Sequence, residues 1–258
     1  MSCRVTILQT NIKWADSDAN QKALESALLS SEKSDLYVLP EMWDTGFLAG
    51  EESKDSLIHN SKFIIQNLKE LARRYDAAIA GSLDVEENGR RYNRFYFVTP
   101  TDTYYYDKRH LFSYAGEDKN FAAGDERNIV EWRGVKFLLQ VCYDLRFPCF
   151  SRNRLTADGI PLYDAIIYVA NWPASRRRVW DVLLQARALE NQCFVVGVNR
   201  VGDDPNCHYD GGSTIIDAKG KNLAKVQDET AASATALLDM ESLNAFRAKF
   251  PVLRDADK

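Results

Sequence analysis

Residues 136–148 read KFLLQVCYDLRFP, an apolar run that ends at a cysteine. The run is continuous rather than alternating, which indicates a strand that is covered on both of its faces. Residues 165–170 (AIIYVA) and 193–199 (CFVVGVN) have the same character. Because such strands need other structure packed on either side, these stretches predict a layered α/β fold.

The rest of the chain supplies further strands and the helices to cover them. Apolar periodicity predicts helices at residues 19–30, 56–75, 178–191 and 240–249. Further strands are predicted at residues 4–9, 35–39, 77–83, 94–99 and 213–217, the last continuing through a turn at 219–221 into a hairpin. No repeat, linker or low-complexity tract interrupts this order. The sequence therefore predicts a single domain over residues 1–258 in which helices cover mixed sheets.

The overall composition is that of an ordinary globular protein. The chain of 258 residues is 45% hydrophobic and 27% charged, with a formal net charge of -4. This balance offers no basic surface for nucleic acid or an anionic membrane. No apolar run approaches the roughly 18 residues that span a bilayer, and the N-terminus lacks the pattern of a secretory signal. We expect a cytoplasmic protein whose partners are small molecules or a second copy of itself.

The five cysteines stand far apart, at positions 3, 142, 149, 193 and 207, and none forms a C-x-x-C pair. An odd number with this spacing predicts neither a disulfide framework nor a zinc site, so reduced thiols are expected. The chain also contains no G-x-S-x-G, Walker or H-E-x-x-H motif. Serine hydrolase, nucleotide-dependent and zinc-protease functions therefore have no support.

Three chemically capable residues follow predicted strands. Glu41 comes after residues 35–40, Lys108 after residues 103–107 and Cys142 after residues 137–141. Ligands of α/β proteins bind beyond strand ends, so this placement is informative. Taken singly, each residue has an ordinary structural interpretation, as a core thiol or a solvated charge. Together they supply a nucleophile, a base to activate it and a cation for the oxyanion that forms.

The segments around these residues resemble the three catalytic segments of the nitrilase, or carbon–nitrogen hydrolase, family. They read LPEMWDTGF at 39–47, YDKRHLF at 106–112 and CYDLRFP at 142–148, and the similarity continues through NWP at 171–173 and ARALEN at 186–191. The resemblance covers nearly the whole chain and is closest to the short ω-amidase branch. It implies an αββα sandwich that pairs as a homodimer across helical surface near residues 178–191, with no metal or organic cofactor.

The resemblance also implies a role for each residue. By motif, Glu41 is the general base, Lys108 the oxyanion donor and Cys142 the nucleophile. Many relatives carry a second glutamate after the lysine, and Glu117, in a stretch at 109–128 that we predict to be a long loop, is the best match. Cys149 stands where many relatives have an acidic residue, which should alter the edge of the substrate pocket rather than the chemistry.

The pocket must decide the substrate, because amide, nitrile and N-carbamoyl hydrolysis share this catalytic set. We expect the pocket and its rim to include Tyr143, Arg146, Trp43, Trp172 and Arg176. A guanidinium would bind a substrate carboxylate while aromatic rings pack a short methylene chain. The expected reaction is hydrolysis of a small carboxylate-bearing primary amide, such as 2-oxoglutaramate, to acid and ammonia through a cysteine thioester. Nitrilase or N-carbamoyl amidohydrolase activity is the alternative.

Two readings from other classes stay open at the level of the sequence. A Cys–His hydrolase would use Cys142 with His59, His110 or His208, and His110 is the most relevant because it lies two residues from Lys108. A non-catalytic binding protein on the same fold is the second. Loss of a catalytic residue would favour it, and all three are present here.

Overall fold

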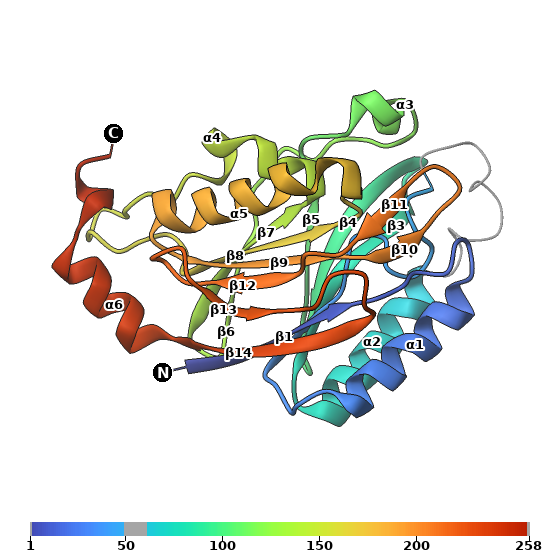
Figure 1. The fold of residues 1–258 in the computed structure, drawn as a ribbon, viewed down its shortest axis with the longest axis horizontal. Helices are drawn as coiled ribbons and strands as arrows, with labels where there is room; N and C mark the ends of the chain where they lie inside the picture. The colour runs from blue at the N-terminus through green and yellow to red at the C-terminus, as the bar shows by residue number, and fades with distance from the viewer. Residues whose placement is uncertain (1, 49–60, 257–258) are drawn as a thin grey trace.

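The computed structural model describes residues 2–48 and 61–256 (Figure 1). Within these ranges two six-stranded sheets form the centre of the molecule. The first sheet runs β14 (Ala232–Asp239), β1 (Ser2–Gln9), β2 (Leu36–Val38), β3 (Ala78–Glu87), β4 (Arg90–Val98) and β5 (Thr103–Asp107). The second runs β13 (Asn222–Lys225), β12 (Thr214–Ile216), β9 (Phe194–Asn199), β8 (Ala165–Ala170), β7 (Val135–Val141) and β6 (Ile129–Trp132).

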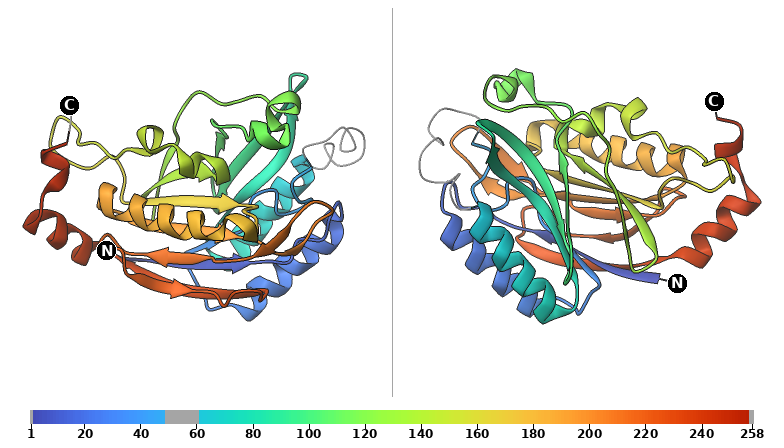
Figure 2. Two further views of the ribbon diagram at one scale, coloured as in Figure 1. Left: turned by 45° about the horizontal axis from the view of Figure 1, so that its top comes forward. Right: turned by 180° about the vertical axis from the view of Figure 1, so that it is seen from behind.

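Helices cover the outer faces of the two sheets. Helices α1 (Ser17–Ser30) and α2 (Ser61–Tyr75) lie on the first sheet, and α5 (Arg177–Asn191) lies on the second, as the two views of Figure 2 show. Helix α6 (Met240–Lys249) follows β14 at one end of the molecule. The short pieces are α3 (Glu117–Asn120), α4 (Pro148–Ser151) and the hairpin of β10 (Val201–Asp203) and β11 (His208–Asp210). The expected αββα sandwich is confirmed.

Strand β7 shows why the apolar run around residue 137 is continuous. Phe137, Leu139 and Val141 face the core between the sheets, where they join residues of the first sheet such as Phe97. Leu138 points the other way and joins the cluster under helix α5. Each face of the strand is therefore buried against a different layer, which removes the polar positions that a half-exposed strand would show.

Element boundaries agree closely with the periodicity in the interior of the fold. The helices predicted at 19–30, 178–191 and 240–249 begin within two residues of α1, α5 and α6. The helix predicted at 56–75 is found from Ser61, and residues 56–60 lie outside the described part of the chain.

The stretch 109–128 differs from the predicted loop. It contains a 3-10 turn at Ser113–Ala115 and helix α3, each too short to produce an apolar period. Strand β14 was not predicted either, because its sequence ASATALLD lies at a sheet edge with most side chains exposed or half-buried. Amphipathic periodicity thus locates the elements that bury a face and misses those that do not.

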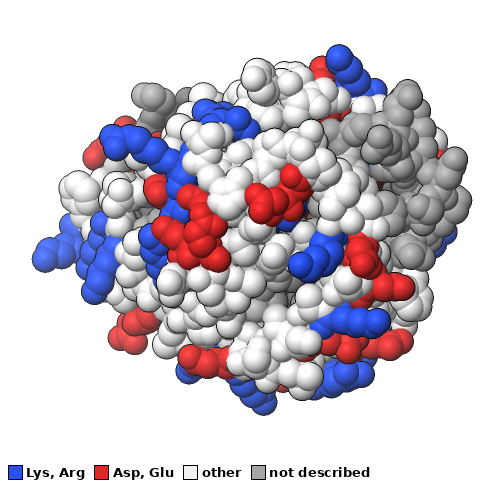
Figure 3. Space-filling view, turned by 45° about the vertical axis from the view of Figure 1, so that its right-hand side comes forward, with Lys and Arg blue, Asp and Glu red and all other residues white. Residues whose placement is uncertain are grey.

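The described surface shows no large separation of charge on the face seen in Figure 3, where acidic and basic side chains are interspersed. No described helix has the length and apolar character needed to cross a membrane.

Candidate active site

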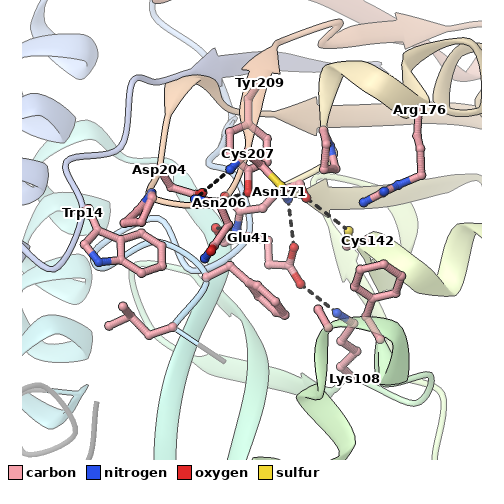
Figure 4. A pocket seen from close by; sticks show the side chains of 16 residues that line it. Trp14, Glu41, Lys108, Cys142, Asn171, Arg176, Asp204, Asn206, Cys207 and Tyr209 are labelled. Atoms are coloured by element: carbon pink, nitrogen blue, oxygen red, sulfur yellow. Dashed lines mark hydrogen bonds and ion pairs between the residues drawn. The ribbon is translucent and has the colours of Figure 1, made fainter. Parts of the chain in front are cut away.

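Four strands deliver polar residues to one region of the sandwich. The chain reaches Glu41 after β2, Lys108 after β5, Cys142 after β7 and Asn171 after β8. Strands β7 and β8 are parallel neighbours, so Cys142 and Asn171 emerge at the same edge of the second sheet. Figure 4 shows how these side chains converge on one cavity. The placement beyond strand ends, on which the sequence argument depended, holds for all three predicted catalytic residues.

Cys142 opens a 3-10 turn, and its backbone is in the left-handed region with φ of 42°. That conformation is uncommon for a residue with a side chain and is often found at functional sites. The partly exposed thiol lines the cavity, with Sγ 4.0 Å from the carbonyl oxygen of Asn171. Burial and then the charge of Glu41 raise the pKa of the Cys142 thiol well above its ordinary value. The resting thiol is therefore protonated and needs a base.

Glu41 is almost completely buried and receives three hydrogen bonds through its carboxylate. Oε1 accepts from Lys108 Nζ at 2.8 Å and from Asn93 Nδ2 at 2.7 Å. Oε2 accepts from the backbone N–H of Asn171 at 2.8 Å, and the Asn171 side chain donates back to the Glu41 carbonyl at 2.8 Å. This double contact joins the end of β2 to the end of β8, and so connects the two sheets across the site.

Lys108 is 1% exposed and lies between two carboxylates. Nζ is 2.8 Å from Oε1 of Glu41 and 3.0 and 2.9 Å from the two carboxylate oxygens of Glu117. Burial by itself lowers the pKa of Lys108, but the charges of Glu117 and Glu41 outweigh it and raise the pKa above its ordinary value. The lysine is therefore a permanent ammonium, able to bind an oxyanion but not to act as a base.

Glu117 joins the same cluster from helix α3 and is fully buried. Besides Lys108, it accepts hydrogen bonds from the backbone N–H of Phe112 at 2.6 Å and from Asn93 Nδ2 at 3.0 Å. Burial is the main cause that raises its pKa. The structure thus brings the fourth residue assigned by resemblance into contact with Lys108, although its helix was expected to be loop.

The cavity above the cluster encloses about 790 Å³, a size typical of small-molecule sites. Its walls are Trp14, Glu41, Phe47, Leu48, Lys108, Phe112, Ala115, Cys142, Asn171, Pro173, Arg176, Asp204, Pro205, Asn206, Cys207 and Tyr209. Arg176 was expected here, and its guanidinium lies 5.4 Å from the centre of the Phe112 ring. Among the described residues, the cavity therefore combines aromatic walls with the guanidinium of Arg176, in addition to the buried Glu41–Lys108 pair (Figure 4).

Trp43 is a correction to the expected pocket. Its side chain is 2% exposed and lies in the apolar cluster between the first sheet and helices α1 and α2, with Leu39 and Leu68. The cavity opens at the strand ends, so a side chain on the outer face of the sheet does not reach it. Cys149 is likewise on the exposed surface of α4 and is not among the residues that line the cavity.

Tyr143, Arg146 and Trp172 lie beside the cavity rather than in its wall. The Arg146 guanidinium is 4.9 Å from the centre of the Trp172 ring, and the Tyr143 ring is 5.0 Å from that of Phe112. Tyr143 supports the wall through Phe112, and Trp172 supports it by donating from Nε1 to the carbonyl of Arg176 at 2.9 Å. Tyr143 also offers its backbone N–H as a hydrogen-bond donor, because the N–H groups of the first turn of a helix have no partner within that helix.

Several cavity residues were not predicted from the sequence. Trp14 comes from a loop and Tyr209 from the β10–β11 hairpin, both distant in sequence from the catalytic motifs, whereas Phe47 ends the first motif. Asn93, which contacts both glutamates, sits in the middle of strand β4. The strand reads RRYNRFYFV, with arginines on either side of Asn93, so the sequence gives no sign that this amide is buried among partners.

Neither of the two histidines in the described part of the chain supplies a partner for the thiol. His110 Nδ1 is 2.7 Å from Asp144 Oδ1 and its ring stacks on Phe147 at 3.9 Å, outside the cavity wall. His208 is exposed between Asp203 and Glu229, and His59 lies outside the described residues. The described geometry therefore favours Glu41 over a histidine as the base for Cys142.

Comparisons with known proteins agree with this geometry. Residues 4–248 match the carbon–nitrogen hydrolase family. The chain is 45% identical to the ω-amidase YafV of Yersinia enterocolitica, over 99% of this chain and 97% of that protein. It is 34% identical to the 2-oxoglutaramate amidase of Bacillus subtilis, over 100% and 99%. The solved structure of XC1258 from Xanthomonas campestris, a CN-hydrolase superfamily protein with an arsenic adduct in its active site, is similar with a TM-score of 0.95 and 38% identity, covering 100% and 98%.

Proposed function

We propose that this chain, which belongs to the carbon–nitrogen hydrolase family, is an ω-amidase that hydrolyses the terminal amide of a small 2-oxo-dicarboxylate monoamide such as 2-oxoglutaramate. The observation that carries the proposal is one cavity containing the Cys142 thiol, the buried Glu41–Lys108 pair and the guanidinium of Arg176. Cys142, Glu41 and Lys108 supply amide hydrolysis, and Arg176 supplies recognition of the anionic end of the substrate.

The first half of the reaction forms a thioester. Glu41 takes the proton of the Cys142 thiol as sulfur attacks the amide carbon, and the electron pair of the carbonyl bond moves to oxygen. The Lys108 ammonium and the backbone N–H of Tyr143 stabilise this oxyanion, and a donor of this kind is typically worth about 3–4 kcal/mol. As the tetrahedral intermediate collapses, Glu41 returns its proton to the leaving nitrogen and ammonia departs.

The second half hydrolyses the thioester. Glu41 accepts a proton from water, whose oxygen attacks the thioester carbon, and the same oxyanion contacts act again. The carbon–sulfur bond then breaks and the proton passes to sulfur, which restores the thiol and releases the carboxylic acid. Glu117 holds Lys108 through both carboxylate oxygens during the cycle. Lys108 stays an ammonium held by Glu117 while Glu41 gains and loses its proton, so little reorganisation is needed.

The cavity's polar groups favour a 2-oxo acid over an amino acid. Burying the ammonium of glutamine without a partner would cost several kcal/mol. Asp204 is an acidic residue in the wall, but its carboxylate already accepts from the backbone N–H groups of Asn206 and Cys207, each at 2.7 Å, and from the Tyr209 hydroxyl at 2.6 Å. It is therefore committed within its own hairpin, and an oxo group meets no such difficulty.

Parallel kinetics on four substrate classes test the proposal. We expect kcat/KM for ammonia release to be highest for 2-oxoglutaramate, ahead of glutamine, a simple nitrile and an N-carbamoyl amino acid. A preference of tenfold or more for the nitrile or the N-carbamoyl compound would contradict the ω-amidase assignment and leave the hydrolase mechanism standing.

Variants at adjacent arginines test carboxylate recognition. Arg176→Met should raise KM for the anionic amide about tenfold or more while leaving hydrolysis of a neutral amide little changed, since only the former needs the guanidinium. Arg178→Met is the matched control, because Arg178 is exposed and does not line the cavity. Equal effects of the two substitutions, or equal effects on charged and neutral amides, would remove Arg176 from substrate binding.

The proposal extends to assembly and location. A groove between α5 and α6 is lined by apolar side chains that include Leu189, Phe246 and Phe250, and Leu189 and Phe250 are 48% and 60% exposed. A second copy, related by a two-fold axis, would cover this surface. A cytoplasmic location suits the mechanism, because a reducing compartment keeps Cys142 as a thiol.

A further inference from the structure

Asn93 occupies an unusual position among the active-site residues. It lies on β4, is fully buried and is absent from the cavity wall, so it does not meet substrate. Its side-chain Nδ2 nonetheless donates to Oε1 of Glu41 at 2.7 Å and to Oε1 of Glu117 at 3.0 Å. Its backbone carbonyl accepts from the backbone N–H of Lys108 at 3.0 Å. One residue therefore contacts all three charged members of the cluster.

The two carboxylate oxygens of Glu41 differ in the number of hydrogen bonds that they accept. A carboxylate oxygen has about two lone-pair sites. Oε1 uses both, one for Lys108 and one for Asn93. Oε2 accepts one backbone N–H, that of Asn171, and so has a lone pair for a second donor. Of the two atoms, Oε2 is the one with capacity to take a proton.

We propose that Asn93 is a positioning residue: its two amide hydrogens engage Oε1 of Glu41 and Oε1 of Glu117, and thereby reserve Oε2 of Glu41 as the atom that accepts the Cys142 proton. The inference rests on the proposed role of Glu41 as base. Lys108 alone cannot do this, because its ammonium is shared between two carboxylates and also has to meet the oxyanion. Asn93 supplies the neutral donors that the excess negative charge requires.

The arrangement has a consequence for pH dependence. The ionisable groups that face the two glutamates are Lys108 and Cys142, together with each other. Hydrogen bonds donated to a carboxylate favour its ionised form, and replacing Asn93 removes two of them from the cluster. The acid limb of activity should then move to higher pH. A residue that only filled space in β4 would leave that limb where it is.

Two substitutions at Asn93 and one control test the proposal. Asn93→Ala removes the donors and the volume, whereas Asn93→Asp keeps the shape, removes the donors and adds a negative charge. We expect each to lower kcat at least about tenfold with KM changed less than twofold, and Asn93→Asp to be the slower near neutral pH. Asn153→Ala is the control, because Asn153 is equally buried but its side chain donates to the backbone carbonyls of Tyr163 and Asn191 and not to a carboxylate.

A substrate-free readout separates this proposal from the assignment of the substrate. The rate at which iodoacetamide alkylates Cys142 is measured against pH in all four proteins, each first shown to be folded by thermal melting. We expect the half-maximal pH to rise in both Asn93 variants and to be unchanged in Asn153→Ala. An unmoved acid limb in both Asn93 variants, or an equal shift in the control, would overturn the proposal. If no amide is hydrolysed while the alkylation limb shifts, the substrate assignment fails and the positioning role stands.

Discussion

The charge state of the cluster around Lys108 depends on the two carboxylates that accept hydrogen bonds from its ammonium. Lys108 is buried, yet its ammonium is retained because two glutamates surround it. A buried charge without such partners would be neutralised instead. The pair of carboxylates therefore maintains the buried cation to which we assign oxyanion binding, and the same cation contacts Glu41, the base that we propose for the thiol.

Replacing Lys108 by methionine tests that cation. Lys108→Met keeps most of the apolar stem and removes the charge, so turnover should fall at least about a hundredfold while KM changes much less. Steady-state ammonia release on the preferred amide provides the measurement, with circular dichroism to establish that the variant folds. Wild-type turnover in Lys108→Met would leave the lysine without an oxyanion role.

Asp44 leads to a prediction of how the stability of the protein depends on pH. It is 3% exposed, and burial is the main cause that raises its pKa to about 7. In an unfolded chain an aspartate has a pKa of about 4. Between these values the folded state binds more protons than the unfolded state, so this residue's contribution to stability falls as pH rises through about 4 to 7.

Asp44→Asn removes that titration. We expect the free energy of unfolding of the variant, relative to wild type, to increase as pH rises through the same window and to level off above it. Urea unfolding at several pH values measures the difference, with the exposed Asp158→Asn as control. A difference that does not vary with pH, or one that grows toward low pH, would contradict the raised pKa.

At the scale of elements, the segment that carries Glu117 is fixed by the chain just before Lys108. The backbone N–H of Gly124 donates to the carbonyl of Lys108 at 3.0 Å. A Cβ at Gly124 would lie 2.3 Å from the carbonyl oxygen of Asp107, which is backbone and cannot move aside cheaply. Only glycine permits this approach, and the approach sets the distance between the segment and β5.

Gly124→Ala should therefore disturb the site through the backbone. We expect the segment to move away from Lys108, with kcat reduced about tenfold or more and a lower melting temperature. Gly159→Ala is a useful control, since Gly159 has a φ of 75° but open space around it, so substitution adds strain without moving a neighbour. The prediction is wrong if the two variants lose stability equally and both keep wild-type kcat.

How far the sequence predicts these elements depends on what each one buries. Strands β7, β8 and β9 are covered on both faces and appear as unbroken apolar runs, and α5 presents a regular apolar stripe. The edge strand β14 and the short helix α3 leave no such pattern, because propensity and burial are weak there. Periodicity therefore predicted the strands and helices that form the layers of the sandwich, but not the edge strand β14 or the short helix α3.

The same reasoning applies to the site. Glu41, Lys108 and Cys142 follow strands in the sequence, so their convergence could be anticipated. Asn93 and Tyr209 reach the site through pairing and loop geometry that no local motif encodes. Trp43 lies in a motif segment, yet it faces the helices because its neighbour Met42 turns the chain with a φ of 44°. The motifs therefore identified the catalytic residues better than they identified the residues of the cavity wall.

At the scale of the whole molecule, the groove between α5 and α6 leads us to predict a homodimer. Light scattering at micromolar concentration should give twice the chain mass. Leu189→Arg should weaken the dimer, because a charge replaces an apolar side chain that a partner would bury. The control is Leu29→Arg on α1, where a leucine that is 78% exposed lies on the other side of the sandwich. A monomeric wild-type protein would rule out this assembly.

The central claim, that Cys142 forms a thioester with the acid part of an amide, is tested most directly by intact-mass measurement of rapidly quenched enzyme. With 2-oxoglutaramate, the account predicts a transient increase in mass equal to the acyl group less one hydrogen, located on the Cys142 peptide. Cys142→Ala should show neither the adduct nor ammonia release, while Cys149→Ala, altered at an exposed thiol outside the cavity, should show both. Ammonia release at a near-normal rate from Cys142→Ala, or an adduct on another residue, would contradict the account.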